Sequence, residues 1–180
     1  MKIFYDCEFL EDGRSIDLIS IGMVAEDGRE LYRIVDDEDT ITRAVAHDWL
    51  RENVVRHLPV KLLPVGALGP GENWDYDRDH DDWHLVQQRP GVREDVEAFI
   101  RDTPDPQLWA WYGAYDHVAY AQLFGRMIDL PAGFPMFTCD VRQVVEQRGG
   151  PQLPEQADGE HNALADARWV KAAYDSLYPF

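Results

Sequence analysis

Two acidic residues stand close together in the first apolar segment of the chain. Asp6 and Glu8 lie in "FYDCEF", residues 4–9. Acidic residues are depleted from strands and are rarely buried without a partner. Side chains two positions apart on a strand project from the same face, so these carboxylates would repel each other. A divalent cation with oxygen ligands would relieve that repulsion, and we therefore predict a metal site here.

Two later segments supply further candidate ligands. Asp116 follows "WAWYGAY", where a predicted strand meets a predicted helix. A carboxylate there is stabilised by the helix N-terminus and lies near the sheet edge, where ligand sites of α/β proteins collect. His161 and Asp166 stand in "GEHNALADA", at the start of the last predicted helix, and their spacing puts them on different stripes of that helix. Each feature alone also fits a helix cap or a solvated side chain, so the prediction depends on their combination.

The elements that must position these residues follow an α/β order. Strand-like segments at 1–10, 16–25 and 30–35 are joined by short turns, which predicts an antiparallel meander. The hydrophobic period then predicts helices over 41–53, 92–102, 116–128, 141–149 and 162–177, and strands over 107–113 and 137–141. We expect a mixed sheet with helices on its faces.

Residues 59–90 interrupt this order with a segment rich in Pro, Gly and acids. It has no sustained period, and we predict an exposed acidic insertion within a single domain that spans residues 1–180. The run that begins at Asp75 resembles a calcium loop, but His80 and Val86 stand where such a loop requires Gly and Glu. The segment is therefore predicted to be a solvated acidic loop.

The overall composition limits the kinds of partner. The chain has 17 Lys and Arg against 34 Asp and Glu, a net charge of -17, which argues against nonspecific nucleic-acid binding through basic residues. A nucleic-acid enzyme remains compatible with this charge, because metal ions held by acidic residues can contact the phosphate.

Cys7 and Cys139 are the two cysteines, so no disulfide framework is expected. Without a membrane-length apolar segment or a signal-peptide pattern, we expect a cytoplasmic protein that does not enter a membrane.

The combined motifs resemble those of a known enzyme family. D-x-E on the first strand, an Asp after a later strand and H-x4-D at the last helix are similar to the DEDDh 3′-to-5′ exonucleases, whose fold is ribonuclease H-like. That fold class is α/β, with an antiparallel first three strands, further parallel strands, and helices on the sheet faces. The segments "FYDCEFLEDG", "IDLISIGMVAEDGRE", "WYGAYD" and "HNALADAR" resemble the polyadenylate-specific 3′-exoribonuclease AS family of actinobacteria. Tyr112 replaces an Asn of many relatives, and Cys7 replaces a Thr but is expected to face away from the metals.

This resemblance implies hydrolysis of RNA from its 3′ end by two divalent ions, Mg²⁺ or Mn²⁺. The implied metal ligands are Asp6, Glu8, Asp116 and Asp166. Asp6 would bridge the two ions, and His161 would accept the proton of the attacking water. The products would be nucleoside 5′-monophosphates. Single-stranded RNA with an adenylate 3′ end is the implied substrate, and a homodimer is the implied assembly.

The same resemblance implies that the residues just after D-x-E, Phe9 and Leu10, contact the terminal nucleotide. An apolar side chain there would stack on any base. Trp111 and Tyr112 are further candidates, although aromatic residues that alternate along a strand also fit a core. The predicted substrate-binding set is Glu8, Phe9, Leu10, Tyr115 and His161.

Other functions remain open on the sequence alone. The same fold could act on DNA, or on short oligonucleotides in the manner of oligoribonuclease. A different class is a non-catalytic, acidic protein-interaction domain. The full set of four carboxylates with His161 favours an enzyme, because a binding module has no need of all five residues.

Overall fold

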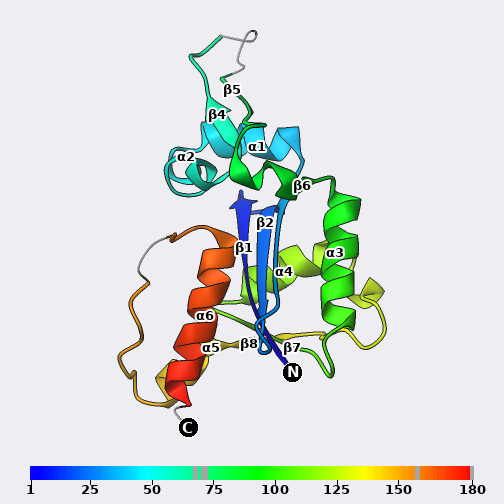
Figure 1. The fold of residues 1–180 in the computed structure, drawn as a ribbon, viewed down its shortest axis with the longest axis vertical. Coiled ribbons are helices and arrows are strands. Elements are labelled where there is room, and N and C mark those ends of the chain that lie inside the picture. The colour runs from blue at the N-terminus through cyan, green and yellow to red at the C-terminus, as the bar shows by residue number, and fades with distance from the viewer. Residues whose placement is uncertain (67–68, 70–72, 157–158, 179–180) are drawn as a thin grey trace.

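A six-stranded sheet forms the centre of the molecule (Figure 1). The structure is a computed structural model, and it describes residues 1–66, 69, 73–156 and 159–178. The strand order in the sheet is β6-β3-β2-β1-β7-β8. The sheet is mixed and has helices on both faces, which confirms the predicted α/β class and is consistent with a ribonuclease H-like fold. No helix in these described ranges has the length and apolar character needed to cross a membrane.

The first three strands form the predicted antiparallel meander. They are β1 (Lys2–Glu11), β2 (Ile16–Ala25) and β3 (Glu30–Val35). Gly13 and Gly28 lie in the two connecting turns with φ of 81° and 90°, a conformation that glycine adopts without steric cost. The β-branched residues of β2 are buried on both faces, as expected for a strand in the middle of a sheet covered on both sides.

Short parallel strands complete the sheet. They are β6 (Val86–Gln87), β7 (Gln107–Ala110) and β8 (Thr138–Asp140). β6 pairs with β3, β7 pairs with β1, and β8 pairs with β7. β7 reaches only Lys2, Ile3 and Phe4 of β1. Beyond Phe4, β1 therefore has a free edge on that side in the described part of the chain, and this stretch carries Asp6 and Glu8.

Helices cover the two faces of the sheet. The first face carries α3 (Arg89–Arg101) and α4 (Ala114–Gln122), and the second carries α1 (Glu38–Ala46), α2 (Asp48–Asn53), α5 (Val141–Gln147) and α6 (Ala163–Leu177). Figure 1 shows α3 and α6 on opposite sides of the central strands. On α6, Ala167, Val170 and Leu177 are buried. Cys7 and Cys139 are free thiols.

One predicted helix is two helices in the structure. The prediction of a continuous helix over 41–53 is wrong, because His47 has an extended backbone between α1 and α2. The His47 ring accepts a hydrogen bond from the Leu50 N–H at 3.3 Å and so caps the second helix. Hydrophobic periodicity does not detect a side-chain cap of this kind, and so it does not predict the break between the two helices.

The region around α4 also differs from its prediction. The strand predicted over 107–113 ends at Ala110, because Tyr112 takes a left-handed backbone conformation with φ of 56°. The helix predicted over 116–128 is α4, which ends at Gln122, followed by the short 3₁₀ helix η3 (Met127–Asp129). Val118 and Ile128, which lie within the range predicted to be helical, are exposed.

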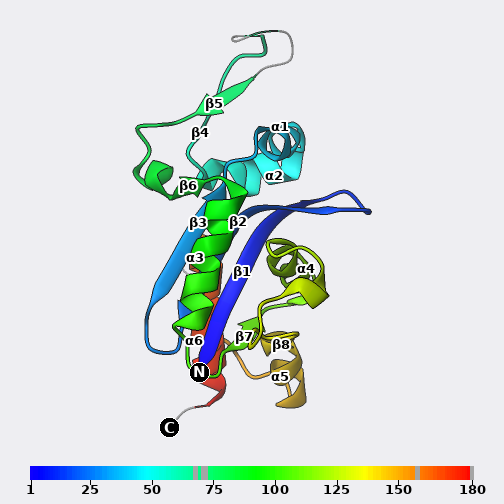
Figure 2. The same cartoon turned by 90° about the vertical axis from the view of Figure 1, so that its right-hand side faces the viewer.

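The segment 59–90 contains regular structure that the composition does not predict. After the 3₁₀ helix η1 (Val55–His57), β4 (Val60–Leu62) and β5 (Trp74–Tyr76) form a separate hairpin, followed by η2 (Asp81–Leu85) and β6. Figures 1 and 2 show this hairpin extending away from the main sheet. Rings of Trp74, Tyr76 and Trp83 pack in series, and the Tyr76 hydroxyl donates to Asp36 at 2.7 Å. The bond from Tyr76 to Asp36 joins residues 40 positions apart, so hydrophobic periodicity does not predict it. Residues 67–68 and 70–72 of the predicted acidic loop lie outside the described residues.

A glycine of β2 lets α6 approach the sheet closely. Gly22 pairs with Asp6 across β1 and β2, and a Cβ at Gly22 would lie 2.3 Å from the carbonyl of Ala163 and 2.4 Å from the Leu164 nitrogen. Because these neighbours are backbone atoms, Gly22→Ala is expected to push the start of α6 outward. We expect the free energy of unfolding to fall by about 1–3 kcal/mol, measured by urea denaturation.

Gly91→Ala is the matched control for that experiment. A Cβ at Gly91 would meet the end of the flexible Gln87 side chain, which can move away. Its effect on stability should be small or favourable, because alanine is the better helix former. Equal stability of Gly22→Ala and the wild-type protein would show that α6 is not held at the distance we describe.

Candidate active site

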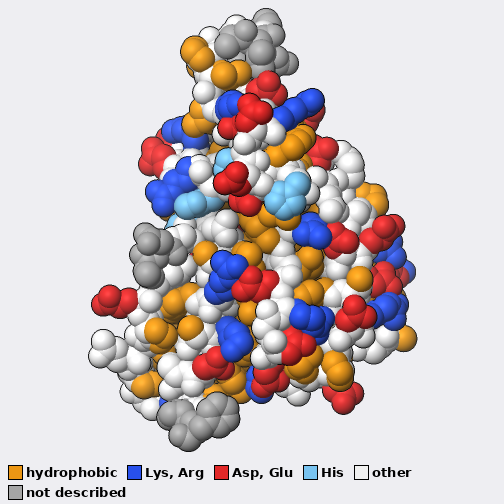
Figure 3. All heavy atoms as spheres, viewed as in Figure 1, with side chains coloured by type: hydrophobic (Ala, Val, Ile, Leu, Met, Phe, Trp, Pro, Cys, Tyr) orange, Lys and Arg blue, Asp and Glu red, His pale blue; other side chains and the backbone are white. Residues whose placement is uncertain are grey.

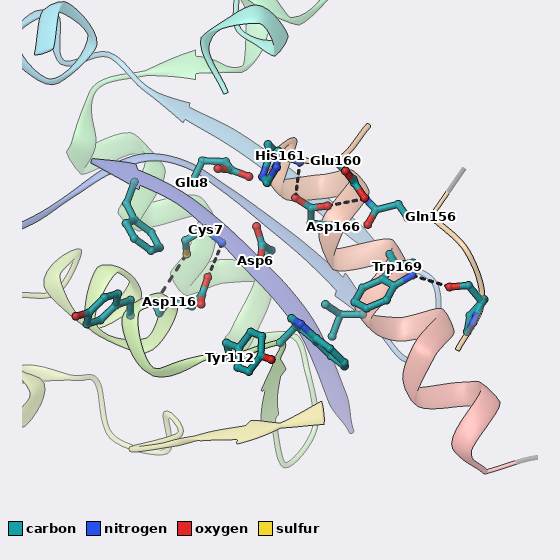
Figure 4. A pocket seen from close by; sticks show the side chains of 15 residues that line it. Asp6, Cys7, Glu8, Tyr112, Asp116, Gln156, Glu160, His161, Asp166 and Trp169 are labelled. Carbon is teal, nitrogen blue, oxygen red and sulfur yellow. Dashed lines mark hydrogen bonds between the residues drawn. The ribbon is translucent and has the colours of Figure 1, made fainter. Parts of the chain in front are cut away.

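A cavity of about 620 Å³ lies along the free edge of β1. Its lining comes from β1, from the segment between β7 and α4, from residues 154–161 and from α6 (Figure 4). The five residues predicted to be catalytic all line it, namely Asp6, Glu8, Asp116, His161 and Asp166. The tertiary structure therefore brings together three segments, at residues 6–8, 116 and 161–166, that lie far apart along the chain.

The strand period of β1 sets the direction of its acids. Asp6 and Glu8 project into the cavity, and Glu8 is only 8% exposed. The Cys7 side chain between them packs in the core beneath α3 and α4. The structure thus confirms that Asp6 and Glu8 share a face of the strand and that Cys7 faces away from them.

Asp116 is tied directly to the free edge of β1. It lies in the first turn of α4, as predicted, and is 6% exposed. Its Oδ1 accepts a hydrogen bond from the Cys7 backbone N–H at 2.8 Å. A strand edge leaves such an N–H without a ladder partner, and the Asp116 carboxylate takes that place. This bond fixes Asp116 beside Asp6.

His161 and Asp166 are held together at the start of α6. Asn162 is the N-cap of the helix, so His161 lies just before it, with a left-handed φ of 67°. The His161 backbone N–H donates to Asp166 Oδ2 at 2.9 Å, and Gln156 Nε2 donates to Oδ1 at 2.5 Å. Trp49 of α2 meets the His161 ring edge to face, with 4.8 Å between the ring centroids.

Three of these side chains are placed so that they could share one ion. Ligand atoms of Glu8, His161 and Asp166 all lie within 4.8 Å of one another. Oxygen-rich donor sets of this kind suit hard divalent cations such as Mg²⁺ and Mn²⁺.

The electrostatics of the cavity favour a bound cation. Burial raises the pKa of the Glu8 carboxyl to about 8, with the charge of Asp166 adding to the effect. Burial likewise raises the pKa of Asp116 to about 7, against the opposing hydrogen bond from Cys7. The pKa of Asp6 is raised well above its usual range by burial and then by the charges of Asp116, Glu8 and Asp166. Burial also raises the pKa of Asp166. Protons or metal ions must therefore neutralise part of this cluster.

Comparison with known proteins places the chain in a family. No protein-family model matches it. The chain is similar to a 3′-5′ exoribonuclease of Mycobacterium tuberculosis, Rv2179c in strain H37Rv and MT2234.1 in strain CDC 1551. Each is 44% identical over 170 residues, which cover 93% of this chain and 88% of the relative. The chain belongs to this 3′-5′ exoribonuclease family. The expectation of an exonuclease family is thereby confirmed.

The cavity of this exoribonuclease-family chain also contains most of the predicted substrate contacts. Phe9 and Tyr115 line it and meet edge to face, with 6.0 Å between their ring centroids. Trp111 and Tyr112 line it as well. Leu10 does not belong to the lining, because its side chain is buried in the core cluster beneath α1 and α2. Its placement therefore gives no support to a role in substrate binding.

Several residues of the exoribonuclease-family site were missed in the sequence. Gln156 and Glu160 come from an irregular segment without a recognisable signal. Asp140 caps α5, and its charge adds to the raised pKa of Asp116. Trp169 lies three residues after Asp166 on α6, and this helical spacing could have identified it. Trp49 reaches His161 only because α2 packs near the start of α6.

The raised pKa values predict an unusual pH dependence of stability without metal. The folded carboxyls of Glu8 and Asp116 hold protons at a pH where their unfolded forms, with ordinary pKa values of 4.5 and 3.8, have lost them. Their contribution is therefore complete at low pH and is lost as pH rises to the folded values of about 8 and about 7. We expect the free energy of unfolding in EDTA to fall between about pH 5 and about pH 8.

Urea denaturation over this pH range, in EDTA and in saturating Mn²⁺, measures that effect. Mn²⁺ should flatten the profile, because a cation replaces the protons, and should stabilise the protein by mass action. Glu8→Gln should flatten the profile in EDTA. A metal-free protein that is as stable near pH 8 as near pH 5 would contradict the prediction.

Proposed function

We propose that this chain is a metal-dependent 3′-to-5′ exoribonuclease that releases nucleoside 5′-monophosphates. The observation that supports it most is the convergence of four carboxylates and His161 in one cavity. Its relatives at 44% identity carry the name 3′-5′ exoribonuclease. The motifs resemble the DEDDh exonucleases, in which the same set of residue types holds two divalent ions.

The residues present fit two divalent ions. Asp6, Glu8, Asp116 and Asp166 offer carboxylate oxygens in a site where burial raises the pKa of each carboxyl, and neighbouring negative charges add to the effect for Asp6, Glu8 and Asp116. Such ions, when bound, would lower the pKa of the attacking water and stabilise charge on the attacking and leaving oxygens.

The other residues have roles that the geometry suggests. The imidazole of His161 would accept the proton of the attacking water, and the backbone bond to Asp166 and the Trp49 ring would restrict its position. Phe9 and Tyr115 would contact the base of the 3′-terminal nucleotide. Stacking of this kind tolerates any base.

The charge distribution suits metal-mediated contact with RNA. Most lysines and arginines of the described chain are already paired with acids, as in Arg43 with Asp17, Arg168 with Glu30 and Lys2 with Glu26. The face shown in Figure 3 has acidic and basic side chains interspersed and no broad basic surface. RNA affinity should therefore depend only weakly on salt concentration and strongly on the divalent ion.

Substrate preference, assembly and location rest on the resemblance. We propose a preference for adenylate 3′ ends, a homodimer and a cytoplasmic location, as in the polyadenylate-specific 3′-exoribonuclease AS family. Light scattering on the purified protein measures the assembly.

A time course on 5′-labelled RNA with an adenylate 3′ end tests the activity. The reaction should contain Mn²⁺ or Mg²⁺, with mixed-sequence RNA, matched DNA and a dinucleotide as parallel substrates. A 3′-to-5′ ladder that pauses at the first non-adenylate residue supports both the activity and the preference. Equal ladders on RNA and DNA would favour a general exonuclease, and cleavage of the dinucleotide alone would favour an oligonucleotide-clearing enzyme. A protein that neither binds metal nor cleaves any substrate would be an acidic interaction domain.

A further inference from the structure

A second group of aromatic side chains lines the same cavity. Trp111 meets Trp169 at 5.0 Å and Tyr112 at 5.6 Å between ring centroids, edge to face in both cases. We call Trp111, Tyr112 and Trp169 the aromatic wall. It is separate from the pair formed by Phe9 and Tyr115.

The acids lie between these two aromatic groups. At the start of the stretch of β1 from Phe4 to Phe9, the Phe4 side chain packs in the same hydrophobic cluster as Trp111 and Trp169. At the other end, Phe9 meets Tyr115. Asp6 and Glu8 stand between Phe4 and Phe9 on the strand. Figure 4 shows Tyr112 below Asp6, Trp169 to its right, and Glu8 and His161 above it.

The aromatic wall is held in place by contacts with the surrounding protein. Trp169 Nε1 donates to the Pro154 carbonyl at 3.0 Å. The Arg142 guanidinium lies 5.8 Å from the centroid of the Trp111 ring. The Tyr112 backbone N–H donates to Asp140 Oδ1 at 3.3 Å. The rings are therefore positioned before any ligand arrives, which reduces the entropy lost on binding.

Core packing does not explain Tyr112. Its side chain is 63% exposed, and its backbone has a φ of 56°, which costs free energy for a residue other than glycine. Strain of this kind persists where the surrounding structure imposes it, and it clusters at ligand sites. An exposed ring held at a cavity mouth is suited to stacking on a planar ligand.

We infer that the aromatic wall binds the base of the nucleotide on the 5′ side of the scissile phosphate. This inference rests on the proposed function. A phosphodiester placed at the carboxylates has one nucleoside on each side, and the proposed function assigns the 3′-terminal base to Phe9 and Tyr115. The wall provides the planar surface for the other base. The ligand is therefore the penultimate base of single-stranded RNA, bound by stacking without a requirement for its identity.

An abasic substitution tests this inference directly. The probes are two 5′-labelled pentanucleotide RNAs, one intact and one with an abasic ribose at the penultimate position, and the readout is the single-turnover rate of the first cleavage at subsaturating protein. The wild-type protein should cleave the abasic RNA about 5- to 150-fold more slowly, the range expected for one stacked base. Tyr112→Ala should slow cleavage of the intact RNA and leave the rate on the abasic RNA nearly unchanged.

Matched variants distinguish the site for the penultimate base from the site for the terminal base. Tyr112→Phe keeps the ring and should lose much less activity on the intact RNA than Tyr112→Ala does. Tyr115→Ala should slow both RNAs equally, because both carry the terminal base. Trp169→Leu removes a different ring of the aromatic wall and should have the same effect as Tyr112→Ala. Circular dichroism checks that this variant is folded. Equal rates of the wild-type protein on the two RNAs, or an equal effect of Tyr112→Ala on both, would overturn the inference. Failure of the wild-type protein to cleave the intact RNA would instead overturn the proposed function.

Discussion

The Asp6→Asn variant is expected to hydrolyse RNA at least about a thousandfold more slowly than the wild-type protein, because a bound metal ion contributes several kcal/mol to transition-state stabilisation. The charges of Asp116, Glu8 and Asp166 all act on Asp6, which indicates a central place in the carboxylate cluster. Asparagine has nearly the same shape but lacks the negative charge that holds a divalent cation.

The same substitution should stabilise the metal-free protein. Burial and three neighbouring negative charges disfavour the ionised Asp6 carboxylate, so a neutral side chain there removes an unfavourable interaction. We expect Asp6→Asn to unfold at a higher temperature than the wild-type protein in EDTA at about pH 8. Added Mn²⁺ should then stabilise the wild-type protein much more than the variant.

Thermal unfolding and RNA cleavage, each with and without Mn²⁺, give the two measurements. Asp39→Asn is the matched control, since Asp39 is an exposed acid of α1 that makes only a surface ion pair with Arg43. Its activity should equal that of the wild-type protein, and its stability should change by less than about 1 kcal/mol. An Asp6→Asn protein that retains a tenth of the wild-type rate, or that unfolds at a lower temperature in EDTA, would remove Asp6 from the centre of the site.

The His161→Asn variant is expected to lower kcat by about 10²–10⁴-fold, the range for loss of a positioned general base. Asparagine is the suitable replacement, because His161 has φ of 67° and asparagine tolerates that conformation better than alanine. The backbone bond from residue 161 to Asp166 should survive. The loss of rate would then reflect the imidazole alone.

Metal affinity decides between two roles for His161. Its ring lies close enough to Glu8 and Asp166 to serve as a ligand as well as a base. If it is the base, calorimetric titration with Mn²⁺ should give the same affinity and stoichiometry for His161→Asn as for the wild-type protein. A parallel loss of affinity and kcat would assign His161 to the metal site. Trp49→Phe, which keeps a ring against the imidazole, should retain most of the activity.

Local patterns in the sequence are sufficient for much of the fold. The period of two on the first strand predicts that Asp6 and Glu8 share a face while Cys7 enters the core. Turn residues and apolar runs predict the antiparallel meander of β1, β2 and β3. The position of Asp116 in the first turn of its helix and of His161 just before the last helix also follows from short motifs. Each of these features depends on residues that are neighbours along the chain.

The tertiary structure alone decided how these motifs meet. Gly22 permits the close approach that brings the start of α6 onto β2, and the short β7 leaves the edge of β1 open to Asp116. Gln156 comes from the irregular segment before α6 and Trp49 from α2, while Leu10 turns into the core although its sequence neighbour Phe9 lines the cavity. Such contacts depend on packing between segments that are distant along the chain. They produce no repeating hydrophobic pattern in the sequence from which they could be predicted. For this reason the candidate catalytic residues could be proposed from local motifs, whereas the shape of the cavity and the aromatic wall required the folded chain.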